Sequence, residues 1–495
     1  MTTSLEAVGL TFVVYLAAML AIGLYSYRRT RDLADYILGG RRLGKWVTAL
    51  SAEASDMSGW LLLGLPGYAY ASGLDGGWIA LGLLVGTYLN WRLVAARLRH
   101  YSLAAGDALT LPDFFEQRFA DQSRVLRVVA AAFILLFFTF YTGSGLVAGG
   151  KLFNAVFGID YTWAVALGGL MILMYTLLGG FLAVSWTDLV QGLLMVFALA
   201  IAPVAAIEAL GGWSQTLALL QAHNASLLDP LRDRHGHPLG TVAIASLLGW
   251  GLGYFGQPHI LARFMAIGDP AQLPQARRIA VGWVAVSLVG ALLVGLIGVV
   301  YLAHPLQGAA TERVFMNLVQ LVFHPLVAGA MLAAILAAIM STADSQLLVA
   351  SSALAEDFYK ALWRREAGRR ELIWVGRGAV LLIAVVAFLL AMTPGNKVLD
   401  LVAYAWAGFG AAFGPTVLFA LFWRRMTRNG ALAGIVLGGL TVIVWKQLHG
   451  GLFDLYEIIP GFVASCAAIV IASLLDAPPP SAVTTRFDAV AAESD

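Results

Sequence analysis

The feature that most constrains this chain is a succession of long apolar stretches that recurs along nearly its whole length. A helix needs about 20 mostly apolar residues to cross a bilayer, whereas the strands of a membrane barrel alternate over about 10 residues. The sequence therefore predicts an all-α polytopic membrane protein with thirteen transmembrane helices. The predicted spans cover residues 5–26, 46–71, 77–97, 125–149, 161–180, 183–210, 240–263, 279–303, 325–352, 373–393, 399–423, 430–448 and 456–475.

Composition excludes several other classes of protein. Hydrophobic residues make up 60% of the chain and charged residues 12%, against about 25% charged residues in soluble domains. A net charge of +2 over 495 residues leaves no basic surface for nucleic acid, and the single Cys466 permits no disulfide framework. We therefore expect a surrounding lipid bilayer, no bound nucleic acid and no obligatory protein partner.

The positions of lysine and arginine predict how the chain is oriented. Cytoplasmic loops are enriched in these residues, and an outside N-terminus places all but six of the 31 on the cytoplasmic side. Among them, Arg28, Arg29 and Arg31 follow the first span, and Arg263 ends the seventh. We predict an N-out, C-in topology. The six exceptions are Lys151, Arg232, Arg234, Arg313, Lys397 and Lys446.

No polar stretch is long enough for a separate soluble domain. We therefore expect one transmembrane unit over residues 1–475. Residues 476–495 begin with a run of prolines at 478–480 and are expected to form a disordered cytoplasmic tail.

Two of the predicted spans are interrupted by small and polar residues. Ser51–Gly67 lies in the second span and Leu247–Pro258 in the seventh. Paired interruptions are typical of inverted repeats with a binding site at the membrane midplane, which places the repeats at about 46–210 and 240–423. Close helix packing by small residues is the alternative. It explains Gly251 and Gly253 easily but explains Asp56 poorly.

Acidic residues within the spans are few and are candidates for function. Asp56, Asp188 and Asp344 would each be costly in hydrocarbon unless they are paired or bind an ion. The segment from Ser341 to Ser345 adds three hydroxyls within about one and a half turns. Clustered oxygens facing a broken helix favour a site for a hard monovalent cation, such as sodium. Glu53 is either the wall of a solvated cavity or a ligand.

Aromatic residues near the interruptions suggest a second kind of site. Trp250 and Tyr254 are four residues apart and share one helix face, with Pro258 a turn further on. Together with Tyr141 in the fourth span, they could enclose a small apolar ring, while free backbone amides bind a carboxylate. The alternative is that they are ordinary core aromatics.

Several blocks of this sequence resemble one known family of membrane proteins. SAEASDMSGW (51–60), GWGLGYFGQP (249–258) and ILAAIMST (335–342) are similar to the sodium:solute symporter family, and within it to the bacterial sodium/proline symporters. Spacing and residue order agree in these blocks, and the resemblance runs from the first span to the last. Further matching blocks lie at 35–67, 109–119, 178–188 and 403–415.

The resemblance implies a fold, an activity and a cellular location. It implies a leucine-transporter-like core of inverted five-helix repeats, followed by two extra spans at 430–475. It implies sodium-coupled uptake of L-proline by alternating access through the bacterial cytoplasmic (inner) membrane, with Na+ as the only cofactor and no enzymatic activity.

The resemblance also implies roles for individual residues. Asp56 would affect sodium affinity, and Arg41 would affect coupling near the cytoplasmic mouth. Sodium would be bound by backbone carbonyls and two hydroxyls, from Ala54, Met57, Ala338, Ser341 and Thr342. The substrate would be bound by Ser58, Gly59, Tyr141, Trp250, Tyr254 and Pro258.

The sequence departs from the family pattern in two places. Glu53 stands where a small residue is expected, and Asp344 stands where some relatives carry serine. Some family members have a second sodium site at the positions of Asp188, Asp344 and Ser345. These three residues are therefore candidates for a second cation site, and the number of sodium ions moved with each solute, one or two, stays open.

Three other functions remain as alternatives. The first is sodium-coupled transport of a different small solute by the same fold. The second is a cation channel, which two interrupted spans and an intramembrane aspartate also suit. The third is a membrane enzyme or sensor, which is disfavoured because the sequence lacks catalytic motifs such as HExxH or GxSxG.

Overall fold

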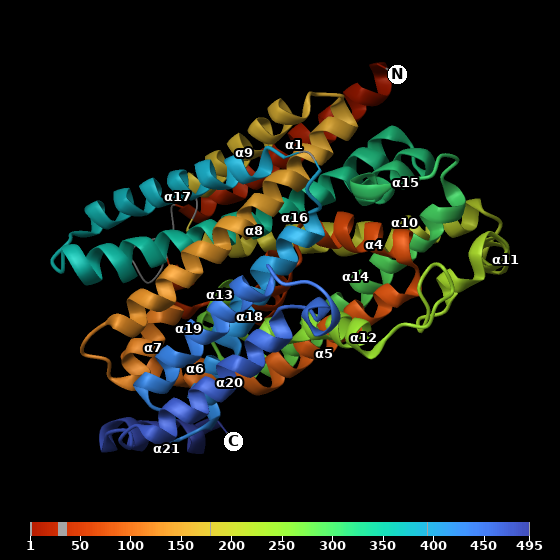
Figure 1. The fold of residues 1–495 in the computed structure, drawn as a ribbon. Coiled ribbons are helices and arrows are strands. Elements are labelled where there is room, and N and C mark those ends of the chain that lie inside the picture. The colour runs from red at the N-terminus through yellow and green to blue at the C-terminus, as the bar shows by residue number, and fades with distance from the viewer. Residues whose placement is uncertain (1, 28–36, 179, 394, 495) are drawn as a thin grey trace.

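The computed structural model describes residues 2–27, 37–178, 180–393 and 395–494 of the chain. In these residues the regular structure is helical, apart from two isolated β-bridges. Figure 1 shows the long helices side by side in one bundle. Arg28, Arg29 and Arg31, which entered the orientation argument, lie outside the described residues.

Each predicted span in the first half of the chain corresponds to one or more helices. The helices are α1 (Thr2–Tyr27), η1 (Gly39–Arg41), α3 (Lys45–Asp56), η2 (Trp60–Gly64), α4 (Leu65–Ser72), η3 (Leu74–Gly76), α5 (Gly77–Leu89), η4 (Asn90–Val94), α6 (Ala95–Ala104), α7 (Leu111–Phe119), α8 (Val125–Phe157), α9 (Tyr161–Leu178), α10 (Phe181–Ala209), α11 (Trp213–Asn224) and η5 (Ala225–Leu228).

The second half follows the same pattern. The helices are α12 (Thr241–Leu248), η6 (Gly249–Gly256), α13 (Pro258–Ala266), η7 (Pro270–Gln272), α14 (Leu273–Tyr301), η8 (Gly308–Arg313), α15 (Val314–Val322), α16 (Pro325–Ser352), η9 (Ala353–Trp363), α17 (Arg369–Ala391), α18 (Val398–Phe422), α19 (Arg428–Trp445), η10 (Gly451–Asp454), α20 (Ile458–Leu475) and α21 (Ser481–Ser494).

Ten helices in the described residues are long and apolar enough to cross a membrane by themselves. Among the thirteen predicted spans, those outside this set include the two interrupted ones, whose helical pieces are individually short. Also outside it is α9, of which Tyr161–Leu173 counts as a shorter apolar helix.

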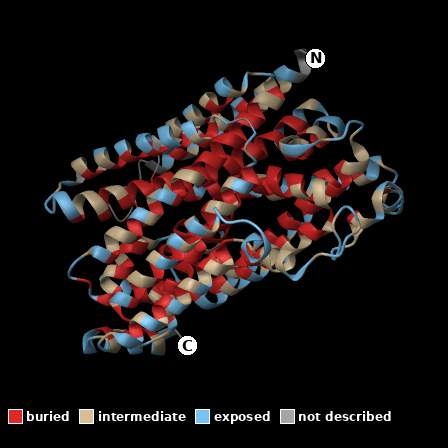
Figure 2. Ribbon diagram, in the orientation of Figure 1, coloured by how far each residue is buried: buried red, intermediate tan, exposed pale blue. Residues whose placement is uncertain are grey.

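Burial divides the bundle into an inner and an outer group of helices. In α16 and α18, 83% of the most apolar window is buried, against 28% in α1. Figure 2 shows the same division, with buried residues concentrated in the middle of the bundle and exposed ones along its outside. The interruptions of the second and seventh spans lie in this buried interior, whereas α12 at the start of the seventh span has no buried residue.

The interruption of the second span is confirmed and falls at Met57–Gly59. Met57 leaves the helical conformation (φ −83°, ψ 76°), and its amide donates to the carbonyl of Glu53. The chain then resumes as the π-helix η2 at Trp60. Such wide turns often mark functional sites inside helices.

The interruption of the seventh span is also confirmed. The chain passes from α12 through the 3₁₀-helix η6 and an extended Gln257 into α13, which starts with Pro258 in its first turn. Proline suits a first turn because its missing amide would have no helical partner there. A Cβ on Gly251 would lie 2.2 Å from the Gly82 carbonyl of α5, so part of the glycine content serves close packing.

Residues 481–494, which were expected to be disordered, instead form the helix α21. Its apolar side chains Val483, Phe487 and Val490 are buried. Phe487 contacts Tyr101 of α6, with ring centroids 6.4 Å apart, and Arg486 donates to the Gln117 carbonyl at 3.0 Å. In Figure 1, α21 and α7 lie at one end of the bundle, and α11, α15 and the start of α1 lie at the other.

Candidate functional site

The two interruptions meet in the centre of the molecule. The indole ring of Trp60, just after the first break, and that of Trp250, in η6 of the second, have centroids 6.1 Å apart. Tyr141 of α8 donates its hydroxyl hydrogen to the carbonyl of Asp56 at 2.9 Å, where α3 ends. The structure therefore brings two distant parts of the sequence and a third helix around one point.

Four of the five residues expected to bind sodium lie together beside the first break. The Ser341 hydroxyl donates to the Ala54 carbonyl at 2.7 Å and lies 3.2 Å from the Ala338 carbonyl. The Thr342 hydroxyl lies 3.4 Å from the same Ala54 oxygen. Met57 occupies the break itself. All of these residues are buried, so neutral oxygens from α3 and α16 converge in a site shielded from water.

The acidic residues of α3 point in different directions. Glu53 accepts a hydrogen bond from the Trp91 indole at 2.9 Å, so it is directed at η4, and it is 1% exposed. Asp56 is fully buried, and its carboxyl oxygens have no hydrogen-bond partner within the described part of the chain. A buried carboxyl of this kind is a candidate for an electrostatic influence on a nearby cation.

Aromatic rings line the second break. Trp250 stacks on Tyr456 at 5.5 Å, and Tyr254 meets Trp406 edge-on at 5.0 Å. The Trp406 indole donates to the Trp250 carbonyl at 2.7 Å, which ties α18 to η6. Trp60, Trp406 and Tyr456 were not predicted, because nothing in their local sequence separates them from the other core aromatics.

The remaining predicted substrate residues are also buried. Ser58 lies in the first break, next to Trp60, whose amide approaches the serine hydroxyl at 3.5 Å. Gly59 lies against α8, because a Cβ on it would come 2.8 Å from the Cβ of Ala148. Pro258 lies beyond the second break, at the start of α13.

The three candidates for a second cation site lie together, and an arginine lies among them. The Arg263 guanidinium is 3.2 Å from Asp188 and donates to the Ser345 hydroxyl at 2.5 Å. Asp344 accepts from the same serine at 3.4 Å. The sequence had placed Arg263 at a cytoplasmic helix end, but its side chain is fully buried. The signal that could have found it is the pair of intramembrane aspartates, which require a compensating cation.

Arg41 lies away from the central site, at the end of the bundle that carries α21. It forms an ion pair with Asp107 at 2.8 Å and donates to the carbonyls of Met265 and Ala108 at 2.6 and 2.8 Å. Burial lowers the pKa of the Arg41 guanidinium from its ordinary value, and the neighbouring Asp107 opposes that effect. Arg41 thereby joins the segment before α3 to the end of α13.

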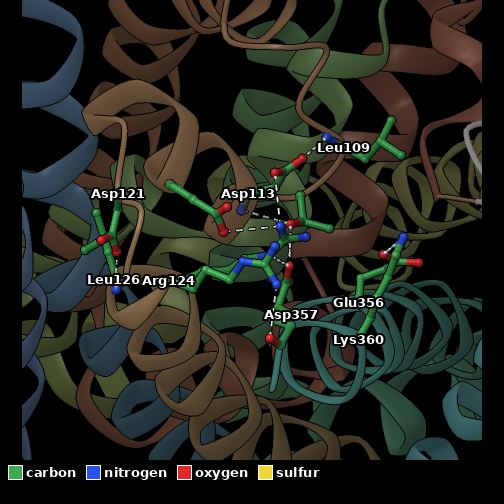
Figure 3. A network of polar contacts seen from close by, with 12 residues as sticks. Leu109, Asp113, Asp121, Arg124, Leu126, Glu356, Asp357 and Lys360 are labelled. Carbon is green, nitrogen blue, oxygen red and sulfur yellow. Dashed lines mark hydrogen bonds and ion pairs between the residues drawn. The ribbon is translucent and has the colours of Figure 1, made fainter. Parts of the chain in front are cut away.

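A second network at the same end joins α7, α8 and η9. Arg127 lies 2.6 Å from Asp357, which is fully buried, and 3.3 Å from both Asp113 and Glu116. Figure 3 shows Asp113 and Asp357 close together in this network, with the Leu109 amide donating to Asp113. The π-helix η9, which continues α16, is therefore joined to α7 and α8.

A buried ion pair lies at the opposite end of the bundle. The Lys151 ammonium of α8 is 2.5 Å from Glu312 of η8. Glu312 also accepts from the amides of Val398 and Leu399, the first two residues of α18. A carboxylate at a helix N-terminus satisfies free amides and complements the helix dipole. These contacts join η8 to α8 and α18 at this end of the bundle.

The residues around the two breaks can bind ligands, but they lie out of reach of solvent. All of the predicted sodium and substrate residues are buried, and the Trp250 side chain, for example, is 6% exposed. Binding groups at paired helix breaks, enclosed near the middle of a bundle of membrane helices, define a secondary transporter that must rearrange to admit its substrate. The molecule is a multi-pass membrane protein.

Comparison with known sequences gives the family. Residues 36–438 match the model of the sodium:solute symporter family. The chain is 54% identical over 482 residues to a sodium/proline symporter of Salmonella typhimurium, covering 96% of this chain and 95% of that protein. It is 49% identical over 474 residues to a high-affinity proline transporter of Bacillus subtilis, covering 95% of this chain and 98% of that protein. The chain belongs to the sodium:solute symporter family, whose members are transporters and not enzymes.

Comparison with solved structures agrees on the fold. A Na+-coupled sialic acid symporter, described in a substrate-bound outward-open state with a novel Na+ site, matches with a TM-score of 0.78. The match covers 96% of this chain and 99% of that one at 21% identity. The fold is therefore leucine-transporter-like, as the resemblance in the sequence implied.

Proposed function

We propose that this protein couples the inward movement of sodium to the uptake of L-proline across a bacterial cytoplasmic membrane. The observation that carries the proposal is 49–54% identity, over nearly the full length, to proteins named for proline transport. Sodium is then a transported substrate and not a cofactor, which corrects our assignment from the sequence. Proline is likewise a transported substrate.

Sodium binds between α3 and α16 in this proposal. The carbonyls of Ala54, Met57 and Ala338 and the hydroxyls of Ser341 and Thr342 are its ligands. Support comes from the convergence of the two hydroxyls on the Ala54 carbonyl. Hard cations prefer oxygen ligands, and the ion would exchange with the hydrogen bonds that these oxygens now make with one another. Asp56 acts on sodium affinity through its charge.

Proline binds beside sodium, between the two breaks. Ser58 and Gly59 of the first break and Tyr141, which contacts that break, are assigned to this site. Trp250, Tyr254 and Pro258 are assigned to it from the second break. Aromatic rings suit the apolar pyrrolidine ring, and the amides at the start of η2 suit its carboxylate. Support comes from the approach of Trp60 to Trp250 and from the contact between Tyr141 and the first break.

Alternating access follows from two sets of contacts at opposite ends of the bundle. The topology that we propose has thirteen spans, with the α11 end outside and the α21 end in the cytoplasm. The inverted repeats are 46–210 and 240–423, with extra spans at 5–26 and 430–475. Residues 1–475 act as one transport unit, and opening at one end requires release of either the Glu312 contacts or the Arg41 and Arg127 contacts.

Sodium-driven accumulation in proteoliposomes tests the proposal. The purified protein is reconstituted and supplied with a panel of radiolabelled amino acids, sugars and carboxylates under an inward sodium gradient. We expect proline to accumulate above its external concentration, and to do so only with sodium. Accumulation of another solute in place of proline would reassign the substrate. Equilibration without accumulation would indicate a channel, because a channel cannot move solute against its gradient.

A further inference from the structure

The side chain of Arg263 occupies a pocket built by four helices. From α13, its guanidinium donates to the Ser51 hydroxyl of α3 at 3.1 Å and to the Ser345 hydroxyl of α16 at 2.5 Å. Its ion pair with Asp188 of α10 is 3.2 Å long, and Ser51 donates to the same carboxylate at 2.6 Å. Every one of these residues is 0% exposed.

The pocket holds two carboxyl groups around one permanent positive charge. Asp188 forms an ion pair with Arg263, and the Ser345 hydroxyl that Arg263 contacts also donates to Asp344. Arginine keeps its charge under all physiological conditions and presents several donors in a fixed plane. A buried carboxylate needs a cation or hydrogen bonds close to it, and here the cation is a side chain of the protein.

We propose that Arg263 is a tethered cation that takes the place of a second sodium ion, so that each proline is carried with one sodium. This inference rests on the proposed function. The candidate ligands for a second ion, from the sequence, are the side-chain oxygens of Asp188, Asp344 and Ser345. One nitrogen of the guanidinium, Nη2, contacts both Asp188 Oδ2 and the Ser345 hydroxyl. A sodium ion bound to the same two oxygens would stand against a like charge in a medium that screens it weakly.

The position of Arg263 explains how a fixed charge can serve a transport cycle. Ser51 lies one turn before Ala54, and Ser345 lies one turn after Ser341, so the pocket borders the proposed sodium site on both α3 and α16. Arg263 itself belongs to α13, which starts at Pro258 directly after the second break. The charge is therefore covalently part of the helix that follows the second break and cannot be released with the cargo.

A merely structural ion pair makes a different prediction. Asp188 Oδ1 and Asp344 Oδ2 are buried and have no hydrogen-bond partner in the residues that the structure describes. If the guanidinium is removed, these oxygens and the Ser345 hydroxyl are free to bind a sodium ion. A structural pair would lose stability in the same variant without any change in the number of bound ions.

The number of sodium ions is measured in two ways on the full-length protein. Equilibrium binding of radiolabelled sodium to the purified protein, without proline, counts sites. The reversal potential of the proline-coupled current in proteoliposomes counts transported ions. We expect one sodium ion, both bound and transported, in the wild type and in Arg263→Lys, which keeps the charge. We expect two bound sodium ions in Arg263→Gln and a return to one in the double variant Arg263→Gln/Asp188→Asn.

Two results would overturn the inference. The first is a wild type that binds or transports two sodium ions. The second is a folded Arg263→Gln protein that still binds one sodium ion. If Arg263→Gln does not reach the membrane, Asp188→Asn and Asp344→Asn decide. With the arginine in place each should keep the wild-type count of one, and a lost ion in either refutes the tethered cation.

The failure of this inference is distinguishable from failure of the proposed function. Absence of sodium-dependent proline accumulation by the wild type would refute the proposed function. A wild type that accumulates proline with two sodium ions would leave the proposed function intact and refute only the role of Arg263.

Discussion

Single hydroxyls on α16 carry the proposed sodium site. Thr342→Ala and Ser341→Ala each remove one ligand oxygen, and a hydrogen bond or contact to a charged group contributes about 1.5–3 kcal/mol. We expect each to raise the sodium concentration for half-maximal proline uptake about tenfold or more, with a much smaller effect on maximal rate. Sodium titration of initial uptake rates measures this.

The matched control lies on the same helix. Ser352 is buried and bonds to the Leu348 carbonyl at 3.0 Å, outside the proposed site. Ser352→Ala should leave the sodium dependence unchanged. Wild-type sodium dependence in both Ser341→Ala and Thr342→Ala would show that sodium binds elsewhere.

Two aromatic side chains carry the proposed proline site. Trp250→Ala or Tyr254→Ala removes buried apolar contact that contributes about 1.5–3 kcal/mol for a large side chain. We expect proline affinity to fall about tenfold or more while sodium binding without proline stays near the wild-type value. Calorimetric titration with proline, and separately with sodium, measures both. Trp374→Ala, on an indole that is 69% exposed, is the control. Unchanged proline affinity would remove these rings from the site.

At this scale the sequence proposed residues that the structure brings close together, but it missed the buried Arg263 beside them. Ser341 and Thr342 could be proposed because hydroxyls clustered with an aspartate stand out inside an apolar span, whereas Ala54 was implied only by the family resemblance. Arg263 could not be predicted as part of the site, because a basic residue at the end of a span normally reaches the membrane surface. Only the packing of α3, α10 and α16 around α13 shows that its side chain turns inward.

At the scale of helices, η6 depends on a very close approach by α18. A Cβ on Gly253 would lie 1.9 Å from Trp406 Nε1, the atom that donates to the Trp250 carbonyl. Gly253→Ala should therefore displace the indole and lower proline affinity at least about tenfold, which corresponds to 1.4 kcal/mol. Proline titration and the thermal unfolding midpoint measure the effect.

Gly282→Ala is the control for this prediction. It makes the same chemical change within α14, at a position with nothing within 4 Å of the added Cβ. It should leave binding unchanged and should not lower the unfolding midpoint, because alanine favours helix more than glycine does. Equal behaviour of the two variants would mean that the contact between η6 and Trp406 does not matter for binding.

The sequence predicted some of the helical elements but not others. Both breaks could be predicted, because glycine, proline and polar residues interrupt otherwise apolar spans. The short helices α7, α11, α15 and α21 could not be placed by a rule based on long apolar stretches. For α21 a signal was present, because Val483, Phe487 and Val490 follow the helical spacing i, i+4, i+7. The adjacent prolines made the segment look disordered.

At the scale of the whole molecule, Glu312 joins η8 to α8 and α18 at one end of the bundle. Glu312→Gln removes the charge that pairs with Lys151 and leaves that ammonium buried without its partner. We expect this end to open more often. A cysteine placed at Ser58, in a background where Cys466 is replaced by serine, should then react about tenfold or more faster with an impermeant thiol reagent added from outside.

Arg313, which follows Glu312 in the sequence, supplies the control for this experiment. Arg313 contacts Asn154 at 3.0 Å and is only partly buried, so Arg313→Gln should change the labelling rate little. Labelling that is unaffected by Glu312→Gln, or equally accelerated by both variants, would show that the Lys151–Glu312 pair does not limit access.

In the one-sodium cycle that we propose, the charge of Arg263 also sets how far the protein can concentrate its solute. One sodium ion entering at 100 mV releases about 2.3 kcal/mol, and a tenfold sodium gradient adds about 1.4 kcal/mol. At about 1.4 kcal/mol per decade, one ion sustains an internal excess of a few hundredfold, whereas two would sustain roughly 10⁵-fold. A guanidinium that stays in the membrane contributes nothing to this work. A cell that relies on this protein therefore reaches a lower ceiling of internal proline, but it has only one sodium ion to pump out for each molecule gained.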